Sequence, residues 1–366
     1  MQEVLTAAAD AFGEKLSEPI DLGGSSRSTV LRCRTGSGTT VVVKAYRDEP
    51  EALACFTAEA AGLAFGTLGP HLLAVDVATP LIVMSDLGTA PSLADTLLGD
   101  TPDTARTALL AWASTYGALA AESIGRQPEL SALRARYDRG RPDWDGAGWI
   151  TGRIAALPEV LAALGVTGPA GLDEDLAVVA SLTDDRHPVF SPGDICPDNN
   201  VLTASGPRVL DFEASGFHPV FLDAAYTRMP FSTCWCVFRL PDELSEATEL
   251  AYRKEILSGY PELADDSLWR DGVLRAAAAW TLDITVHLTG RVLTEDRPMH
   301  SRRRPTPSAR QLLRHRWRTL HAELTTADRL PALAELTDRL LTATHHWPVG
   351  QLPGYPAFRS LAKESP

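Results

Sequence analysis

The chain has 366 residues, of which 45% are hydrophobic and 22% are charged, so it is long enough to bury a sizeable core in two lobes. Its 34 basic and 47 acidic residues give a formal net charge of −13, which repels nucleic-acid backbones and favours a cationic substrate. No segment approaches the roughly 18 uninterrupted apolar residues of a membrane helix, and the N-terminus lacks a signal-peptide pattern. We therefore expect a cytoplasmic protein with neither nucleic acid nor membrane as a partner.

The first part of the chain has the pattern of an antiparallel sheet. Short runs rich in β-branched and apolar residues are separated by turn residues, and one longer segment has helical character. Five strands and one helix would make a compact first lobe. The expected strands are residues 19–22, 29–34, 39–46, 72–77 and 81–84, and the expected helix is 49–65.

A turn of small residues separates the first two expected strands. Gly23, Gly24, Ser25 and Ser26 would let backbone amides approach phosphate oxygens. The segment lacks the G-K-[ST] of a Walker loop and lies between strands, so on its own a plain hairpin turn explains it equally well. Its position relative to Lys44 favours phosphate binding.

Lys44 interrupts the apolar run of residues 41–46, which is costly unless the ammonium group finds an anion. Glu59, in the following helix, is the expected partner, and Glu51 is a weaker competitor. The pair resembles the arrangement in which a strand lysine contacts nucleotide phosphates while a helix glutamate holds it. The alternative is an exposed lysine and an exposed glutamate with no functional link.

The strand pattern ends near Leu87, and the segments that follow are mostly helical, beginning with residues 103–123. We therefore expect an α+β fold with an N-terminal nucleotide-binding lobe over residues 1–87 and a catalytic and substrate-binding lobe over residues 88–366. Backbone groups of Ser85 and Leu87, at the end of the last strand, would lie between the two lobes.

A loop and a hairpin later in the chain bring acidic and amide side chains together. If residues 201–203 pair with 207–209 across the intervening turn, Asn199 and Asp211 lie opposite each other at the open end of the hairpin. Both supply the oxygen donors that Mg²⁺ prefers. Asp194, five residues before Asn199, would lie where a carboxylate can accept the proton of an alcohol.

This segment resembles the aminoglycoside phosphotransferase and choline kinase family, which has the pattern H-G-D-x-x-x-x-N, then a strand and D-F/W-E. The match is Gly193-Asp194, Asn199 and Asp211-Phe212-Glu213. The resemblance implies a bilobal protein-kinase-like fold and transfer of a phosphoryl group from ATP, with Mg²⁺, to a small-molecule hydroxyl.

The resemblance also implies residue roles. Asp194 corresponds to the catalytic aspartate, and Asn199 and Asp211 correspond to the metal ligands. Asp223 matches a family aspartate that braces the catalytic loop. Ser85 and Leu87 match the place where hinge backbone groups bond adenine, next to the nucleotide contacts expected of Lys44, Glu59 and the glycine turn.

Pro192 stands where the family has histidine. The proline should stiffen the loop entrance, and it removes one side-chain hydrogen bond. This departure keeps open a different class of function, a catalytically silent pseudokinase that binds nucleotide and acts as a regulatory or interaction module. A protein kinase is the weaker enzyme alternative, because no A-P-E-type segment follows Asp211.

The sequence leaves the phosphate acceptor open among aminoglycosides, other antibiotics, amino sugars, choline-like alcohols and nucleosides, so antibiotic resistance is one expected role. In the helical pattern of residues 274–288, Trp280, Asp283 and His287 share a face that could contact a cationic acceptor. The competing interpretation, with Trp280 packed in the core, is the more common case for such a helix.

A group of arginines near the C-terminus opposes the acidic average of the chain. A nucleic-acid or anionic-substrate patch here stays open as an alternative, although such runs are usually solvated helix faces. The group consists of the run 301–304 and of Arg310, Arg314, Arg316 and Arg318.

Overall fold

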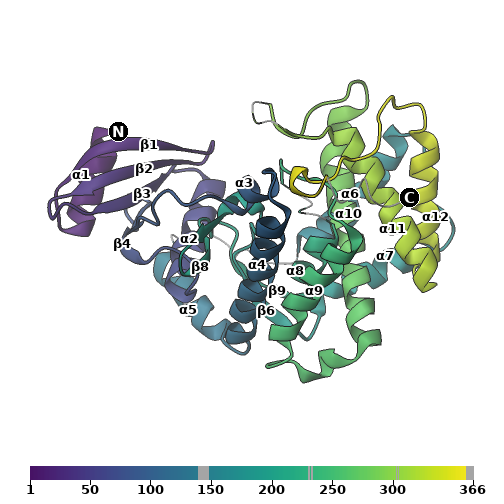
Figure 1. The fold of residues 1–366 in the computed structure, drawn as a ribbon, viewed down its shortest axis with the longest axis horizontal. Coiled ribbons are helices and arrows are strands. Elements are labelled where there is room, and N and C mark those ends of the chain that lie inside the picture. Colours follow the sequence, from purple (N-terminus) through teal and green to yellow (C-terminus); the bar gives the residue numbers. More distant parts are fainter. Residues whose placement is uncertain (139–147, 230, 232–233, 302, 304, 360–366) are drawn as a thin grey trace. The chain divides into compact units, whose positions relative to one another are not determined.

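The computed structural model describes residues 1–138, 148–229, 231, 234–301, 303 and 305–359 (Figure 1). The chain forms two compact units that are each discontinuous in sequence. The first unit contains the described residues of 1–92, 123–146 and 190–217. The second unit contains those of 93–122, 147–189 and 218–366. Within the described part of the chain, every helix is too short or too polar to cross a membrane.

The first unit contains a five-stranded antiparallel sheet in the order β1-β2-β3-β5-β4. Its strands are β1 (Leu16–Gly24), β2 (Ser28–Thr35), β3 (Thr40–Tyr46), β4 (Leu72–Asp76) and β5 (Leu81–Ser85). Its helices are α1 (Gln2–Phe12), α2 (Pro50–Phe65) and α5 (Gln127–Tyr137). A hairpin of β7 (Asn200–Thr203) and β8 (Gly206–Val209) and the short helix η2 (Pro197–Asn199) complete it.

Strand β3 places its residues alternately on the two faces of the sheet. Val41 and Val43 lie in an apolar cluster with Leu5 and Ala8 of α1, so α1 covers one face (Figure 1). Successive strand residues point to opposite faces, and Lys44 therefore points to the other face, where α2 contacts β3. This alternation positions Lys44 for a residue of α2.

The expectation of a single helix in the first lobe is wrong, because α1 precedes the sheet. Leu5 and Ala8 are buried one turn apart, and Gly13 ends the helix in the left-handed conformation with a φ of 80°. The amphipathic N-terminal segment therefore packs on the sheet as a helix.

The β7–β8 hairpin differs by one residue from the expected register. Thr203 pairs with Gly206 and Asn200 with Val209, so the loop has two residues and Asn199 lies opposite Leu210 rather than Asp211. Gly206 has a φ of 105°, which it adopts readily as a glycine and which closes the tighter turn. Asp211 is consequently one residue beyond the position opposite Asn199.

The second unit is mostly helical, as expected for the later part of the chain, and the predicted α+β class is confirmed. Buried tryptophans on three of its helices, Trp112, Trp269 and Trp317, anchor its core. Its helices are α3 (Leu93–Leu97), α4 (Pro102–Ser123, apart from its last residue), α6 (Trp149–Ala163), α7 (Leu172–Ala180), α8 (Val220–Arg228), α9 (Asp242–Ile256), α10 (Asp266–Val292), α11 (Ala309–Ala327) and α12 (Pro331–Ala343). Strands β6 (Pro188–Ser191) and β9 (Gly216–Pro219) pair where the chain passes from one unit to the other.

The expectation of a solvated basic face is wrong for Arg310 and Arg316, whereas Arg318 is exposed as expected. Arg316 of α11 is completely buried, and Arg310 of α11 donates to the carbonyl oxygens of Val292 and Leu293 at the end of α10. Arg314 bonds carbonyl and hydroxyl groups of α12. Arg310 and Arg314 therefore hold helices together, and two residues of the run 301–304 lie outside the described part.

Candidate active site

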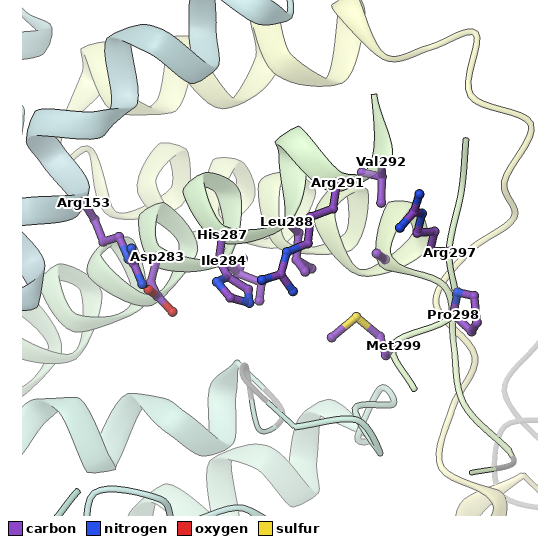
Figure 2. A pocket seen from close by; sticks show the side chains of 11 residues that line it. Arg153, Asp283, Ile284, His287, Leu288, Arg291, Val292, Arg297, Pro298 and Met299 are labelled. Atoms are coloured by element: carbon purple, nitrogen blue, oxygen red, sulfur yellow. The ribbon is translucent and has the colours of Figure 1, made fainter. Parts of the chain in front are cut away.

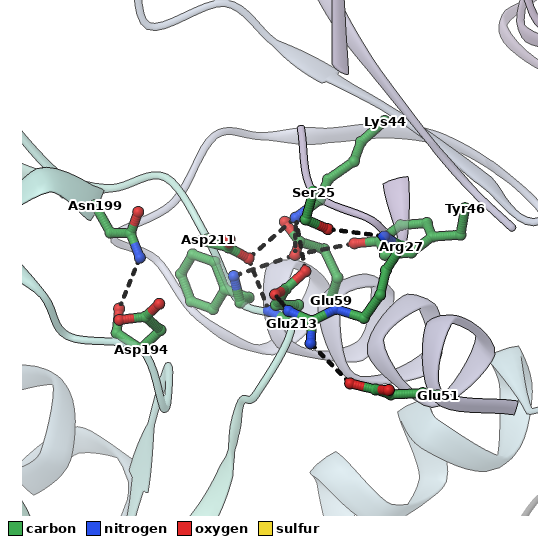
Figure 3. Close-up of polar contacts among 11 residues, drawn as sticks. Ser25, Arg27, Lys44, Tyr46, Glu51, Glu59, Asp194, Asn199, Asp211 and Glu213 are labelled. Carbon is green, nitrogen blue, oxygen red and sulfur yellow. Dashed lines mark hydrogen bonds and ion pairs between the residues drawn. The ribbon is translucent and has the colours of Figure 1, made fainter. Parts of the chain in front are cut away.

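The side chain of Lys44 lies among three carboxylates in the first unit. Its Nζ atom is 2.9 Å from Glu59 Oε2, 3.0 Å from Asp211 Oδ1 and 3.5 Å from Glu213 Oε2. Figure 3 shows these side chains converging from β3, from α2 and from the segment after β8. We call these four residues the Lys44 cluster. Because three carboxylates surround one ammonium group, a further cation would be stabilised beside them.

Glu59 is the completely buried member of the Lys44 cluster. Its Oε2 atom accepts hydrogen bonds from Lys44, from the Tyr46 hydroxyl at 3.1 Å and from the Phe212 amide at 3.3 Å. Its Oε1 atom is buried without a hydrogen bond from any described residue. Burial raises the pKa of Glu59 to about 8, with Asp211 adding to the rise and Lys44 opposing it. Glu59 therefore holds a proton more readily than an exposed glutamate does.

Asp211 stays ionised at neutral pH. Burial alone would raise its pKa, but the Lys44 ammonium group and hydrogen bonds bring the pKa below its usual value. For Lys44, burial would lower the pKa, and the surrounding carboxylates raise it instead. Asp211 Oδ1 accepts from Lys44 and from the Glu213 amide, and among the described residues none donates to Oδ2. One carboxylate oxygen of Asp211 is thus available to a ligand.

The loop before β7 lies directly against the segment after β8. Gly193 has a φ of 86°, and a Cβ atom on it would lie 2.1 Å from the carbonyl oxygen of Ala214. Only glycine satisfies both the backbone conformation and this close approach. The buried Asn200 amide donates to the carbonyl oxygen of Cys196 at 2.7 Å and holds the loop from its other end. This role of Asn200 has no distinctive sequence signal.

Asp194 and Asn199 lie on this loop and are joined through the Asp194 backbone. Asn199 Nδ2 donates to the Asp194 carbonyl oxygen at 3.4 Å (Figure 3), and the Cys196 amide donates to Asp194 Oδ1 at 3.3 Å. Burial raises the pKa of Asp194; the hydrogen bonds from Cys196 lower it, and the charge of Asp211 raises it further. A carboxylate with a raised pKa is the better proton acceptor.

The available oxygen donors suit a magnesium ion. Asn199 uses its amide nitrogen internally, so its Oδ1 atom, like Oδ2 of Asp211, is not hydrogen-bonded to another residue in the described ranges. Mg²⁺ takes hard oxygen donors and often only one or two from the protein, the rest coming from water and phosphate. The carboxylates of Glu59, Asp211 and Glu213 also lie within 4.8 Å of one another, and Lys44 offsets one of their charges.

The glycine turn carries a cation that the sequence interpretation missed. The turn between β1 and β2 is tight at Gly24, where a Cβ atom would lie 2.3 Å from the Ser28 carbonyl oxygen. Arg27, in the same turn, bonds Glu51 at 2.9 Å and also pairs with Glu213. Glu51, the weaker candidate partner of Lys44, is therefore engaged by Arg27. An arginine directly after a glycine turn was the only signal in the sequence.

The segment after β5 is held by another ion pair of the first unit. Arg32 Nε of β2 is 2.7 Å from Asp86 Oδ2, and Asp86 Oδ1 accepts from the Gly88 amide at 2.9 Å. The Ser85 amide bonds the carbonyl oxygen of His71, whereas the Leu87 amide is not bonded to the described part of the chain. A rigid segment with one free backbone donor is suited to hydrogen-bond a planar base.

Three residues singled out in the sequence lie in the second unit. His218 Nε2 is 3.0 Å from Asp223 Oδ1 at the start of α8. On α10, Trp280 stacks on Trp149 with ring centroids 4.8 Å apart and donates to a carbonyl oxygen of α8. Asp283, on the same helix, forms an ion pair instead of presenting an unpaired carboxylate. The roles expected for Asp223, Trp280 and Asp283 stay predictions.

Comparison with known proteins places this geometry in context. A model of the APH phosphotransferase enzyme family matches residues 18–265, a range that includes the whole Lys44 cluster and the loop that carries Asp194. The match covers more than half of the chain, so it rests on much more than the sequence motif of residues 193–213. A search of curated proteins finds no sequence that matches.

Solved structures similar to this chain share its fold. A putative fructosamine-3-kinase from Thermobifida fusca has 20% identity and a TM-score of 0.51, covering 89% of this chain and 99% of its own. The macrolide 2'-phosphotransferase MphH from Brachybacterium faecium has 17% identity and a TM-score of 0.50, with 80% and 93% covered. The GDP and kanamycin complex of APH(2")-IIia has 12% identity and a TM-score of 0.52, with 89% and 99% covered. At these identities the similarity shows a shared kinase-like fold.

Proposed function

Because this chain belongs to the APH phosphotransferase enzyme family, we propose that it transfers the γ-phosphoryl group of ATP to a hydroxyl group of a small molecule. The observation that carries the proposal is the close packing of Gly193 on Ala214, which holds the loop of Asp194 against the segment that begins with Asp211. This packing supports the proposed roles of Asp194 as proton acceptor and Asp211 as metal ligand, since both residues belong to one unit of the protein.

In this proposal residues 1–87 bind the nucleotide. The Lys44 ammonium group contacts the phosphates while Glu59 holds it in place, and the backbone amides of the turn from Gly23 to Ser26 approach the phosphate oxygens. Backbone groups of Ser85 and Leu87 hydrogen-bond the adenine. The unbonded Leu87 amide and the Arg32–Asp86 pair support this last assignment.

The chemical step is assigned to residues 88–366. Asp194 accepts the proton of the acceptor hydroxyl as its oxygen bonds to the γ-phosphorus, and the bond from that phosphorus to the bridging oxygen of ADP breaks. The proton then passes from Asp194 to solvent. Asn199 and Asp211 would hold magnesium, which supplies positive charge against the phosphate oxygens. Asp223 supports the loop, as the family resemblance implies.

The acceptor is proposed as a class and not as one compound. The candidates are aminoglycosides and other antibiotics, amino sugars, choline-like alcohols and nucleosides, and use of ATP fits the expected cytoplasmic location. Binding of the acceptor by Trp280 and Asp283 stays a prediction. The negative charge of Asp283 is already neutralised by Arg153.

A screen of ADP release tests the proposal. Wild-type protein is incubated with ATP, Mg²⁺ and each acceptor class, next to the Asp194→Asn variant and a control, Asp10→Asn, which removes an exposed carboxylate of α1. We expect acceptor-dependent ADP release by the wild type and the control alone. Nucleotide binding without release for any acceptor would instead favour the pseudokinase function that Pro192 keeps open.

A further inference from the structure

A pocket of about 450 Å³ lies entirely within the second unit, in the size range of sites for small ligands. Helix α10 provides one wall, and α6, the segment after α10 and the first residue of α11 provide the others. Most of these residues follow position 265, where the family match ends. The described lining residues are Arg153, Asp283, Ile284, His287, Leu288, Arg291, Val292, Arg297, Pro298, Met299 and Ala309.

The charged groups that line this pocket are mainly positive. Arg153 Nε is 2.7 Å from Asp283 Oδ1, so this pair is neutral overall (Figure 2). The guanidinium groups of Arg291 and Arg297 form no ion pair or hydrogen bond with another residue of the described chain. The protein has a net charge of −13, but these two arginines give the pocket lining a positive charge. A positively charged lining favours binding of an anion.

The imidazole of His287 also lines this pocket. Figure 2 shows His287 and Arg291 extending from α10 toward Met299. Burial lowers the pKa of His287; Arg291 and Arg153 lower it further, and Asp283 opposes them. His287 is therefore neutral at physiological pH and can donate one hydrogen bond to a ligand oxygen.

The segment that carries Arg297 is held in place. The Ala309 amide donates to the Arg297 carbonyl oxygen at 2.8 Å, and the Met299 amide donates to the Pro307 carbonyl oxygen at 2.9 Å. The end of α10 is fixed by the bonds of Arg310 to its last carbonyl groups. Both uncompensated arginines are thus anchored through their backbones.

Apolar side chains complete the pocket and restrict the ligand further. Ile284, Leu288 and Met299 line it together with Val292. Apolar walls with a few charged groups suit a ligand that has a short hydrocarbon body and an acidic end. A bare inorganic anion would leave these walls in contact with water.

We propose that this pocket binds a small organic anion through Arg291 and Arg297, with a carboxylate or phosphate as the acidic group. The pocket shares no residue with the Lys44 cluster, and the inference does not depend on the proposed phosphoryl transfer. Arg153 already neutralises Asp283, so the net positive charge of the pocket lining comes from Arg291 and Arg297. Guanidinium groups bind carboxylate and phosphate through paired hydrogen bonds.

Direct titration of the full chain without nucleotide tests this inference. Glutarate and propyl phosphate are the two probes, and glutaramide is the uncharged probe, all at constant ionic strength and followed by calorimetry. The variants are Arg291→Gln and Arg297→Gln. Arg270→Gln is the matched control, since Arg270 is an exposed arginine of α10 outside the pocket. Both test positions are exposed and unpaired, so their variants should fold as the wild type does.

We expect saturable binding of at least one charged probe and none of glutaramide. Each pocket variant should weaken that binding about tenfold or more, and Arg270→Gln should change it by less than about threefold. Binding of only one probe would identify the acidic group. Equal weakening in Arg270→Gln and the pocket variants, or no saturable binding of either probe, would overturn the inference. A failed ADP-release screen would leave this result unaffected.

Discussion

Lys44 and Glu59 form a buried ion pair, with Nζ and Oε2 2.9 Å apart and side-chain exposures of 7% and 0%. The pair joins β3 to α2 across the face of the sheet opposite α1. Removing one partner of a buried ion pair is strongly destabilising, because the other partner stays buried without a group to pair with. Lys44 is therefore both a candidate phosphate contact and a structural requirement of the first unit.

Replacing Lys44 by methionine should destabilise the protein strongly. The change leaves the ionised Asp211 without its cation and the buried Glu59 without its hydrogen-bond donor, so we expect a loss of about 3–5 kcal/mol in the free energy of unfolding. The double variant Lys44→Met, Glu59→Gln should lose less than the sum of the single changes. Urea unfolding measures these values, with the exposed Lys15→Met as control; additive losses would argue against the coupling.

The raised pKa of Glu59 predicts a specific dependence of stability on pH. The group ionises near 4.5 when unfolded and at about 8 when folded, so its stabilising contribution is complete below pH 4.5 and is lost as pH rises toward 8. The pKa of Asp194 is raised as well. The pKa shifts of Lys44 and Asp211 affect stability only at pH values outside the range from 4.5 to 8. The free energy of unfolding should fall less from pH 5 to pH 8 in Glu59→Gln than in the wild type. Equal slopes would refute the assignment.

A methyl group at Gly193 should disturb the loop of Asp194. Alanine there requires a positive φ and a Cβ atom 2.1 Å from the Ala214 carbonyl oxygen, whereas Gly206→Ala requires only the positive φ in open space. The backbone strain alone costs about 1–3 kcal/mol. We expect both variants to lose stability, and only Gly193→Ala to lose most of its turnover. Similar turnover in the two variants would show that the close packing does not position Asp194.

The strands of the first unit could be predicted because their apolar alternation and Gly/Ser turns are local signals. The register of the β7–β8 hairpin could not be predicted. The same residues can form a loop of two or three residues, and the observed two-residue loop goes with a φ of 105° at Gly206. The role of Arg27 was also hidden, because its partner Glu213 is 186 residues away in the sequence. Burial of Arg316 was unexpected because fully buried arginines are rare.

Asp211→Asn should weaken the metal-dependent part of nucleotide binding. The change removes the anionic oxygen that is free in the Lys44 cluster, so affinity for ADP in the presence of Mg²⁺ should fall about tenfold to a hundredfold. Without Mg²⁺ the two proteins should bind ADP with more similar affinities. Calorimetric titrations with and without Mg²⁺ measure this difference, and Asp10→Asn, at an exposed position of α1, serves as control. An unchanged magnesium dependence would exclude Asp211 as a ligand.

The central claim is that Asp194 removes a proton while the Lys44 cluster binds the nucleotide. The most direct test follows the γ-phosphoryl label of ATP onto an acceptor found in the ADP-release screen, for the wild type and Asp194→Asn, and measures nucleotide affinity for both. We predict affinities within about threefold and label transfer that is about 10²–10⁴ times slower in the variant. Label transfer by Asp194→Asn at the wild-type rate would contradict the account.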